Sequence, residues 1–433
     1  MIVAEVQMWG RTIGAVGWDA ARGIGNFEYT PEFARSSIDV SPLTMPLSNR
    51  IYSFPSLSET FHGLPGLVAD SLPDRFGNAL IDAWLAREGR TPESFTPVDR
   101  LCYVGKRGMG ALEYAPALGP PYEVSKDIQI GALVELASEI LTQREHLSES
   151  FASPDREAAL QDILRVGTSA GGARAKAIIA WNPETDEVRS GQVDADRGFS
   201  YWLLKFDGVS GNKDKELDDP KGYGLVEYAY YLMALDAGID MPECRILEEN
   251  DRNHFMAKRF DRTDGDGKLH MLSLGAMAHY DYNQAGAHSY EQAFRVMQRL
   301  DLPMASIEQQ FTRMAFNIVA RNQDDHVKNI AFLMERDGSW SLSPAFDVTY
   351  SYNPSGLWTG VHQMSLNGKR DDFSVSDFVE CGRNISLLRG RAEEMLQKVQ
   401  EVVIGWPGFA KAAGVPDETV QRIGRTHRTT LPD

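Results

Sequence analysis

The stretch NQDDHVKN, residues 322–329, contains the spacing of polar residues that most restricts what this chain can fold into. The carboxylate of Asp324 is followed five positions later by the amide of Asn329, and Asp347 lies eighteen residues after that amide. An aspartate can orient a hydroxyl or accept its proton, and amide and carboxylate oxygens are the ligands that Mg²⁺ prefers. The D-x-x-x-x-N spacing is typical of the catalytic loop of a phosphoryl-transfer enzyme that uses ATP and Mg²⁺.

Other interpretations of this stretch remain open. The register with Asn329 favours Asp324 as the catalytic carboxylate, but Asp325 is only one residue away. Asp324, Asp325 and His326 could instead be metal ligands of a hydrolase, although H-x-H and H-E-x-x-H motifs are absent from the sequence. The doublet and the histidine could also form a solvated turn after a helix.

Two further features bear on nucleotide binding. In SAGGARAK, residues 169–176, small residues would let backbone N–H groups approach phosphate oxygens, and Lys176 would add a positive charge. Lys205 ends an apolar strand and Glu227 follows early in a helix, which is the order of the lysine–glutamate pair of kinases. Each feature alone is more often an ordinary glycine-rich turn or a strand-end lysine with its head in water.

The hydrophobic periodicity predicts elements of both kinds. Residues 1–30 alternate with period two and predict a small antiparallel sheet, while residues 66–87 predict helices interrupted at Pro73. Strands are predicted over 101–115, over 177–181, up to Lys205, and over 254–262. Helices are predicted over 130–145, 155–166 and 225–237. From about residue 290 the pattern is mainly helical, except for a β-hairpin that turns at Asp337-Gly338.

These elements predict an α+β fold with two lobes like those of a protein kinase. The N-lobe is mixed α/β, the C-lobe is mainly helical, and an α+β subdomain precedes them. The predicted domains are the N-terminal subdomain at 1–120, the N-lobe with the nucleotide loop at 121–262, and the C-lobe with the catalytic loop at 263–433.

Composition excludes several classes of protein. The formal net charge of −17 disfavours direct binding to nucleic acid or anionic lipid. Only three cysteines occur, with no C-x-x-C pair, so neither a zinc site nor a disulfide framework is expected. No apolar run approaches the roughly 18–20 residues of a membrane span, and the N-terminus does not read as a signal peptide. A cytoplasmic protein with no membrane association is therefore expected.

Taken together, the motifs resemble those of the HipA family of serine/threonine protein kinase toxins over nearly the whole chain. The segments SPLTMPL, DSLPDRFGN and VGKRGMGALEY follow the order of the family's N-terminal subdomain. The family's loop S-x-x-G-A-x-x-K matches Ser169, Gly172, Ala173 and Lys176, and its strand lysine matches Lys205. Its R-F-D-R segment matches Arg259, Phe260, Asp261 and Arg262. Its catalytic loop D-x-H-x-K-N matches Asp324, His326, Lys328 and Asn329, and its metal aspartate matches Asp347.

The resemblance implies which residues form the site. Catalytic roles fall to Asp324, His326 and Lys328, with Asn329 and Asp347 as Mg²⁺ ligands. The residues implied in ATP binding are Gly171, Gly172, Ala173, Arg174, Ala175, Lys176, Lys205, Glu227, Lys258, Arg259 and Phe260.

The resemblance also implies partners and regulation. Family members phosphorylate a protein of the translation machinery, such as an aminoacyl-tRNA synthetase. A small helix-turn-helix antitoxin restrains them, and DNA is reached only through that antitoxin. They also autophosphorylate a loop serine, here Ser169.

The chain departs from the family's pattern at three positions. Asp325 stands where some relatives have glycine, and Arg174 and Ala175 replace the more usual Gln and Pro or Glu. Two alternatives to a protein kinase remain: an ATP-binding scaffold without turnover, and a small-molecule kinase.

Overall fold

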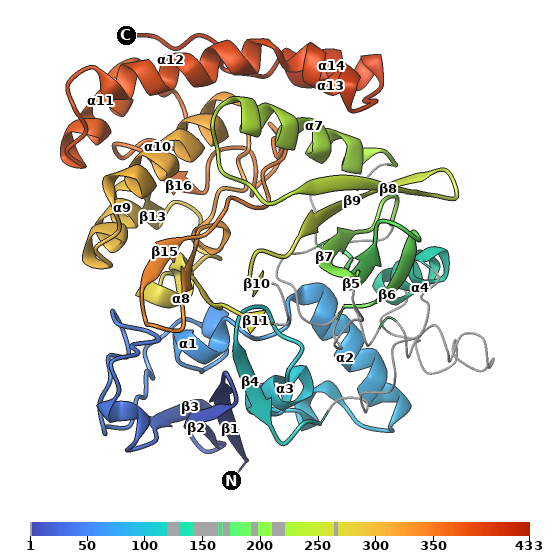
Figure 1. The fold of residues 1–433 in the computed structure, drawn as a ribbon, viewed down its shortest axis with the longest axis vertical. Helices are drawn as coiled ribbons and strands as arrows, with labels where there is room; N and C mark the ends of the chain where they lie inside the picture. The colour runs from blue at the N-terminus through green and yellow to red at the C-terminus, as the bar shows by residue number, and fades with distance from the viewer. Residues whose placement is uncertain are drawn as a thin grey trace. The chain divides into compact units, whose positions relative to one another are not determined.

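The computed structural model describes residues 2–118, 130–142, 163, 167, 174–191, 198–209, 221–263 and 267–433 (Figure 1). The chain forms two compact units. Unit 1 comprises Met1–Lys221, Arg245–Leu272 and Met334–Gly338, and unit 2 comprises Gly222–Cys244, Ser273–Leu333 and Ser339–Asp433. The division into three domains remains a prediction.

The first sheet of unit 1 is antiparallel and confirms the prediction for residues 1–30. Its strand order is β3-β2-β1-β4, with bounds Val3–Met8 (β1), Arg11–Asp19 (β2), Ile24–Tyr29 (β3) and Leu112–Ala115 (β4). Met8 pairs with Arg11, so Trp9 and Gly10 form a two-residue hairpin turn. Both turn residues have positive φ, 53° and 75°, as the turn that best matches the strand twist requires.

Helices follow the first three strands in the chain, and one of them lies where a strand was predicted. Residues 66–87 form α1 (Gly66–Ala69) and α2 (Arg75–Arg87), as expected. The strand predicted over 101–115 is wrong for most of its length, because α3 (Pro97–Val104) occupies its start and only β4 is a strand. Thr96 and Asp99 form a capping box around Pro97 at the first helical position. A short apolar run such as RLCYV does not separate helix from strand by periodicity, and these start signals decide it.

The second sheet of unit 1 has the strand order β6-β5-β7-β9-β8. Helices α2 and α4 pack with it in one apolar core that includes Phe76, Leu133, Ile179 and Trp202. The helix predicted from residue 130 and the strands predicted over 177–181, up to Lys205 and from 254 are confirmed, whereas the helix predicted over 155–166 lies largely outside the described residues. The bounds are Ile130–Thr142 (α4), Lys176–Asn182 (β5), Glu187–Ser190 (β6), Ser200–Lys205 (β7), Cys244–Glu249 (β8), Arg252–Lys258 (β9), Arg262–Thr263 (β10) and Gly267–Lys268 (β11).

A buried carboxylate ties the two sheets of unit 1 together. Asp261 is fully buried and accepts hydrogen bonds from Arg259 Nη2 at 2.6 Å, Arg262 Nη1 at 3.1 Å and the backbone N of Gly110 at 2.7 Å. Burial alone would raise the pKa of the Asp261 carboxyl, but the two guanidinium groups and these hydrogen bonds hold it well below its usual range. The residues just before β4 are therefore fixed to the chain that follows β9.

Unit 2 is mainly helical, as predicted. Helix α7 ends just before Gly238, whose φ of 84° suits a helix C-terminus. The predicted hairpin forms around Gly338 (φ 90°), a residue of the short stretch that belongs to unit 1. The bounds are Tyr223–Asp236 (α7), Leu274–Ala278 (α8), His288–Ser289 (β13), Tyr290–Arg299 (α9), Met304–Val319 (α10), Ala331–Met334 (β14), Trp340–Leu342 (β15), Met364–Ser365 (β16), Val375–Asn384 (α11), Arg391–Ile404 (α12), Trp406–Ala412 (α13) and Asp417–Gly424 (α14). β12 (His270–Ser273) lies where the chain passes from unit 1 to unit 2. In the described part of the chain, no helix combines the length and apolar character of a membrane span.

Two buried histidines of unit 1 predict that the free energy of unfolding decreases at acidic pH. Burial lowers the pKa of His254 and of His270 to about 4, and both side chains are fully buried. In the unfolded chain they titrate near ~6.5, so the unfolded state binds more protons between these values. The free energy of unfolding should therefore fall as pH drops from about 6.5 toward 4, by up to about 1.4 kcal/mol per pH unit for each histidine.

Urea unfolding followed by circular dichroism over this pH range measures the effect. His270→Gln should flatten the pH dependence, whereas the same change at the exposed His62 should not. A free energy of unfolding that stays constant across the range would contradict the prediction.

Candidate active site

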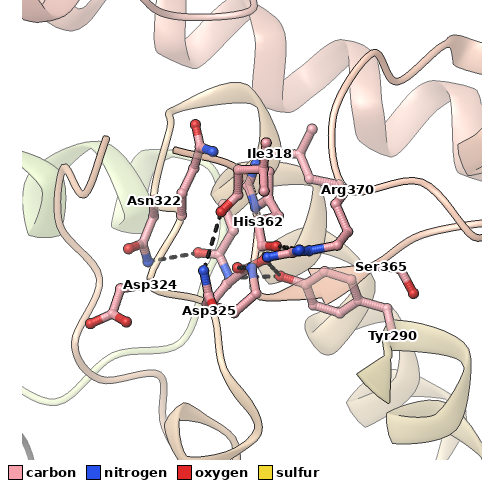
Figure 2. Close-up of polar contacts among 12 residues, drawn as sticks. Tyr290, Ile318, Asn322, Asp324, Asp325, His362, Ser365 and Arg370 are labelled. Carbon is pink, nitrogen blue, oxygen red and sulfur yellow. Dashed lines mark hydrogen bonds and ion pairs between the residues drawn. The ribbon is translucent and has the colours of Figure 1, made fainter. Parts of the chain in front are cut away.

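The two carboxylates of the Asp324-Asp325 doublet lie in different surroundings (Figure 2). Asp325 is buried, and three donors satisfy it: Tyr290 Oη at 2.6 Å and His362 Nδ1 at 2.8 Å bond Oδ2, while the backbone N of Gln363 bonds Oδ1 at 2.7 Å. Burial would raise the pKa of the Asp325 carboxyl, but His362 and the other donors hold it below its usual value. Since both oxygens are occupied, Asp325 is poorly suited to be a base or a metal ligand.

The hydrogen bonds of His362 fix its tautomer. Arg428 Nη1 lies 2.9 Å from Nε2, and a guanidinium can only donate, so Nε2 is the acceptor. The imidazole is therefore neutral, with its proton on Nδ1, where it is donated to Asp325. The backbone oxygen of His362 accepts from Arg370 Nε at 2.6 Å. The doublet, the C-terminal segment and the chain around His362 are thus joined by one polar network.

Asp324, in contrast, is open. Its side chain is 43% exposed, and Oδ1 accepts a hydrogen bond from Trp358 Nε1 at 2.7 Å. His326 Nε2 is 3.8 Å from the same oxygen. Oδ2 makes no hydrogen bond or ion pair with any residue that the structure describes. One oxygen is therefore held and the other can receive a hydroxyl.

The amide of Asn329 is oriented by the same loop. Its Nδ2 donates to the backbone oxygen of Asp324 at 2.8 Å, so its Oδ1 points elsewhere and accepts no hydrogen bond from the described residues. An amide with its nitrogen engaged and its oxygen available suits a hard cation such as Mg²⁺. Among the described residues, no group of three or more His, Cys, Asp or Glu side chains is arranged to hold a metal ion. A Mg²⁺ ion would therefore depend on the amide, on few carboxylates and on the nucleotide.

Asp347 comes close to this loop through backbone pairing. Gln323 N donates to Ser351 O at 3.0 Å, and Ser351 N donates to Arg321 O at 3.1 Å. Asn322 Nδ2 lies 3.4 Å from the backbone oxygen of Asp347. Asp347 is half-buried and has a left-handed φ of 53°, which is uncommon outside glycine and is often found at functional sites.

His326 and Lys328 flank an aromatic side chain that the sequence did not indicate. The Tyr282 ring centre lies 5.9 Å from that of His326 and 4.9 Å from Lys328 Nζ. His326 Nδ1 is buried and has no hydrogen-bond partner among the described residues. Tyr282 thus packs beside His326 and Lys328, two residues that the sequence predicts to be catalytic.

The two lysines implied in nucleotide binding lie in unit 1. Lys176 and Lys205 are directly paired across β5 and β7, so they share one face of the sheet, and both are buried. Lys176 Nζ is 3.3 Å from Asp74 Oδ2, and Lys205 Nζ is 5.7 Å from the ring centre of Phe255. This face therefore carries two ammonium groups that are shielded from water.

The other implied nucleotide residues are distributed as follows. Arg174 is half-buried, and Ala175 is buried with its carbonyl accepting from Phe206 N. Ser169, Gly171, Gly172 and Ala173 lie outside the described residues.

Three residues at and after the end of β9 are also implied in nucleotide binding, and their surroundings differ. The guanidinium of Arg259 bonds Asp261 and Gly108 O, so its side chain is occupied within unit 1. Lys258 is exposed and Phe260 is half-buried. Glu227 is buried on α7 in unit 2, and its pairing with Lys205 remains a prediction.

Besides Tyr282, three groups that bond the aspartate doublet were not found from the sequence: Tyr290, Trp358 and His362. They lie 34 to 37 positions from the carboxylates that they bond. No spacing rule connects residues so far apart, so only the folded structure reveals them.

Comparison with known proteins gives matches over most of the chain. A model of the HipA N-terminal domain matches residues 4–115, and a model of the HipA-like C-terminal domain matches residues 168–406. A solved complex, the Shewanella oneidensis MR-1 toxin–antitoxin system of HipA, HipB and its operator DNA, contains a chain that superposes with a TM-score of 0.67 at 16% identity. The superposition covers 98% of this chain and 95% of that one, and this likeness confirms the predicted fold class.

Two curated relatives bear on chemistry. "Putative kinase Y4mE" of Sinorhizobium fredii is 24% identical over 212 residues, which is 46% of this chain and 43% of that protein. "Putative kinase" of Haemophilus influenzae is 27% identical over 189 residues, which is 37% of this chain and 55% of that protein. The chain thus spans about half the length of the curated relatives it matches.

Proposed function

Because the chain belongs to the HipA family, we propose that it is an ATP- and Mg²⁺-dependent serine/threonine protein kinase. The observation that carries the proposal is the contrast within the doublet. Asp325 is satisfied by three donors, whereas Asp324 keeps one oxygen open beside an amide whose own oxygen is available. Two curated relatives with kinase names support the same chemistry.

The proposed mechanism assigns a task to each group. Asp324 Oδ2 accepts the hydrogen bond of the acceptor hydroxyl, orients it toward the γ-phosphorus, and takes its proton as the new P–O bond forms. The bond from the γ-phosphorus to the β,γ-bridging oxygen of ATP breaks, and ADP is the leaving group. Asn329 Oδ1 and the Asp347 carboxylate would hold Mg²⁺, which neutralises the charge of the phosphates when it is bound. Lys176 and Lys205 provide buried positive charge for the phosphates, where low dielectric strengthens the attraction.

The partners are proposed from the family. We infer that a small helix-turn-helix antitoxin binds this chain, because the similar solved complex contains HipB and operator DNA. DNA would then be reached only through that protein, in agreement with the net charge of −17. The proposed substrate is a protein of the translation machinery, such as an aminoacyl-tRNA synthetase.

Turnover of labelled ATP tests the proposal most directly. Incubation of the full chain with γ-labelled ATP, Mg²⁺ and a cell lysate should label one or a few proteins on serine or threonine. ATP binding without transfer would favour the scaffold alternative. Label found only in a small molecule would favour the small-molecule kinase.

Asn329→Ala and Asp347→Ala should each weaken Mg²⁺-dependent ATP binding. Each change removes an oxygen ligand from a cation that tolerates few replacements. Loss of one hydrogen-bond-scale contact to a charged group, about 1.5–3 kcal/mol, corresponds to a Kd raised by about 10- to 100-fold. Calorimetric titration of ATP with and without Mg²⁺ measures it. If both variants kept the affinity and the Mg²⁺ dependence of the unmodified chain, the assignment of Asn329 and Asp347 as Mg²⁺ ligands would be wrong.

Ser169 is proposed as the autophosphorylation site. A phosphate on this serine adds about −1.5 to −2 charges, which would repel the nucleotide phosphates. The modified chain should therefore bind ATP at least about tenfold more weakly, which corresponds to about 1.4 kcal/mol. Mass spectrometry after incubation with Mg²⁺ and ATP locates the phosphate, and Ser169→Ala is the control. Phosphate only at other positions, or normal ATP binding by the modified chain, would argue against this site.

A further inference from the structure

A loop outside every predicted motif reaches the open carboxylate. Residues 353–360, with the sequence NPSGLWTG, follow Asp347 in the chain, and Trp358 Nε1 donates to Asp324 Oδ1 at 2.7 Å. This is the one hydrogen bond that the Asp324 side chain makes with the described residues. The orientation of that carboxylate therefore depends on where the indole is held.

The loop is closed at its base. Asn353 N donates to Thr359 O at 3.3 Å, and Gly356 N donates to Asn353 O at 2.9 Å. The side chain of Asn353 also accepts from the backbone N and the hydroxyl of Ser355. A Cβ atom at Gly360 would lie only 2.5 Å from Gly356 O, so the chain is tightly folded where the loop returns. The indole thus projects from a compact turn.

The other end of this segment is fixed by the buried carboxylate. Gln363 Nε2 donates to the backbone oxygen of Trp358, and Gln363 N donates to Asp325 Oδ1. His362 also bonds Asp325. The two ends of residues 358–363 therefore bond the two neighbouring aspartates: the indole bonds Asp324, and the backbone at residue 363 bonds Asp325. Asp325 is therefore linked to Asp324 through residues 358–363 as well as through the peptide bond between them.

The chemistry of the indole suits a positioning role. An indole N–H can donate but cannot accept, so it cannot take the proton that the Asp324 carboxylate receives from the acceptor hydroxyl. Its bond to Oδ1 restricts rotation of the carboxylate, and Oδ2 has no hydrogen-bond partner among the described residues. Errors of about 1 Å in the placement of a reacting group can cost about 100-fold in rate. Holding one oxygen of Asp324 in place can therefore contribute strongly to the rate of phosphoryl transfer.

We propose that Trp358 is a positioning residue for phosphoryl transfer, which orients the Asp324 carboxylate toward the acceptor hydroxyl. The inference rests on the proposed kinase activity. It adds to the site a residue that acts through Asp324.

The first measurement tests the hydrogen bond without any activity. The full chain has eight tryptophans, so ¹⁵N-tryptophan labelling gives a small set of indole N–H resonances. Trp358→Phe identifies the resonance of Trp358 by its absence. Asp324→Ala should shift this resonance upfield, because the indole loses a charged acceptor. An unshifted resonance would overturn the inference.

The second measurement tests the role in transfer. Trp358→Phe keeps an aromatic ring but removes the N–H, and kcat should fall about 10- to 100-fold while the Kd of Mg²⁺-ATP is unchanged. In the Asp324→Ala background the same change should cause no further loss. Trp406→Phe is the matched control, because it also deletes an indole N–H, which donates to Val420 O at 2.9 Å, and should leave kcat unchanged.

The outcomes separate the two proposals. A Trp358→Phe variant with full kcat, or one that loses as much activity in the Asp324→Ala background, would overturn the positioning role alone. An unmodified chain that binds Mg²⁺-ATP but transfers no phosphate would overturn the proposed function.

Discussion

Asp324→Ala is expected to lower the rate of phosphoryl transfer by about 10²–10⁴-fold, the usual effect of removing a positioned general base. The side chain is 43% exposed and its one hydrogen bond among the described residues is to Trp358, so little of the fold depends on it. The midpoint of thermal unfolding and the Kd of ATP should therefore stay close to those of the unmodified chain. Single-turnover transfer of labelled phosphate, with calorimetry on the same samples, measures all three.

Asp324→Asn is the companion variant. It keeps the shape of the side chain and an oxygen for the indole of Trp358, but it cannot accept the proton of a hydroxyl. It should be as inactive as Asp324→Ala if proton transfer dominates, and partly active if orientation dominates. An Asp324→Ala variant with full activity would mean that another group serves as the base.

The sequence indicated which loop forms the candidate site, but not which distant side chains bond the residues of that loop. The spacing from Asp324 to Asn329 defined the loop, because a short motif places its own residues within one turn of chain. It left the choice between Asp324 and Asp325 open, since adjacent residues share the same register. Their different environments arise from Tyr290 and His362, which only the tertiary fold brings to the doublet.

The same limit explains the errors and omissions elsewhere. The strand predicted over 101–115 rested on a short apolar run, and the capping signal at Thr96, which lies outside that run, decided for a helix. The role of Arg259 in ATP binding stays a prediction, and the sequence did not indicate that its guanidinium pairs with Asp261, two residues further along. A motif identifies which residue types are present, whereas their hydrogen-bond and ion-pair partners depend on which groups the fold buries beside them.

Asp325→Ala is expected to act on stability and only secondarily on transfer. It removes the acceptor of three donors in a buried site, leaving the phenol of Tyr290, the imidazole of His362 and a backbone N–H without their partner. Each buried polar group left without its partner costs about 1–3 kcal/mol, so the free energy of unfolding should fall by about 3 kcal/mol or more. Urea unfolding of the full chain, followed by tryptophan fluorescence, measures the loss.

Two further variants show whether that loss has the proposed cause. Tyr290→Phe deletes one of the three donors and leaves the carboxylate in place, so it should cost about 0.5–1.5 kcal/mol, the contribution of one hydrogen bond. Asp417→Ala, in the first turn of α14, removes an exposed carboxylate and should change the free energy of unfolding by less than about 0.5 kcal/mol. If Asp325→Ala unfolded at the same urea concentration as Asp417→Ala, the network around the buried aspartate would not stabilise unit 2. If instead it were destabilised but regained transfer when refolded at low temperature, the doublet would divide its tasks as the structure indicates: one aspartate holds the loop, and its neighbour meets the hydroxyl.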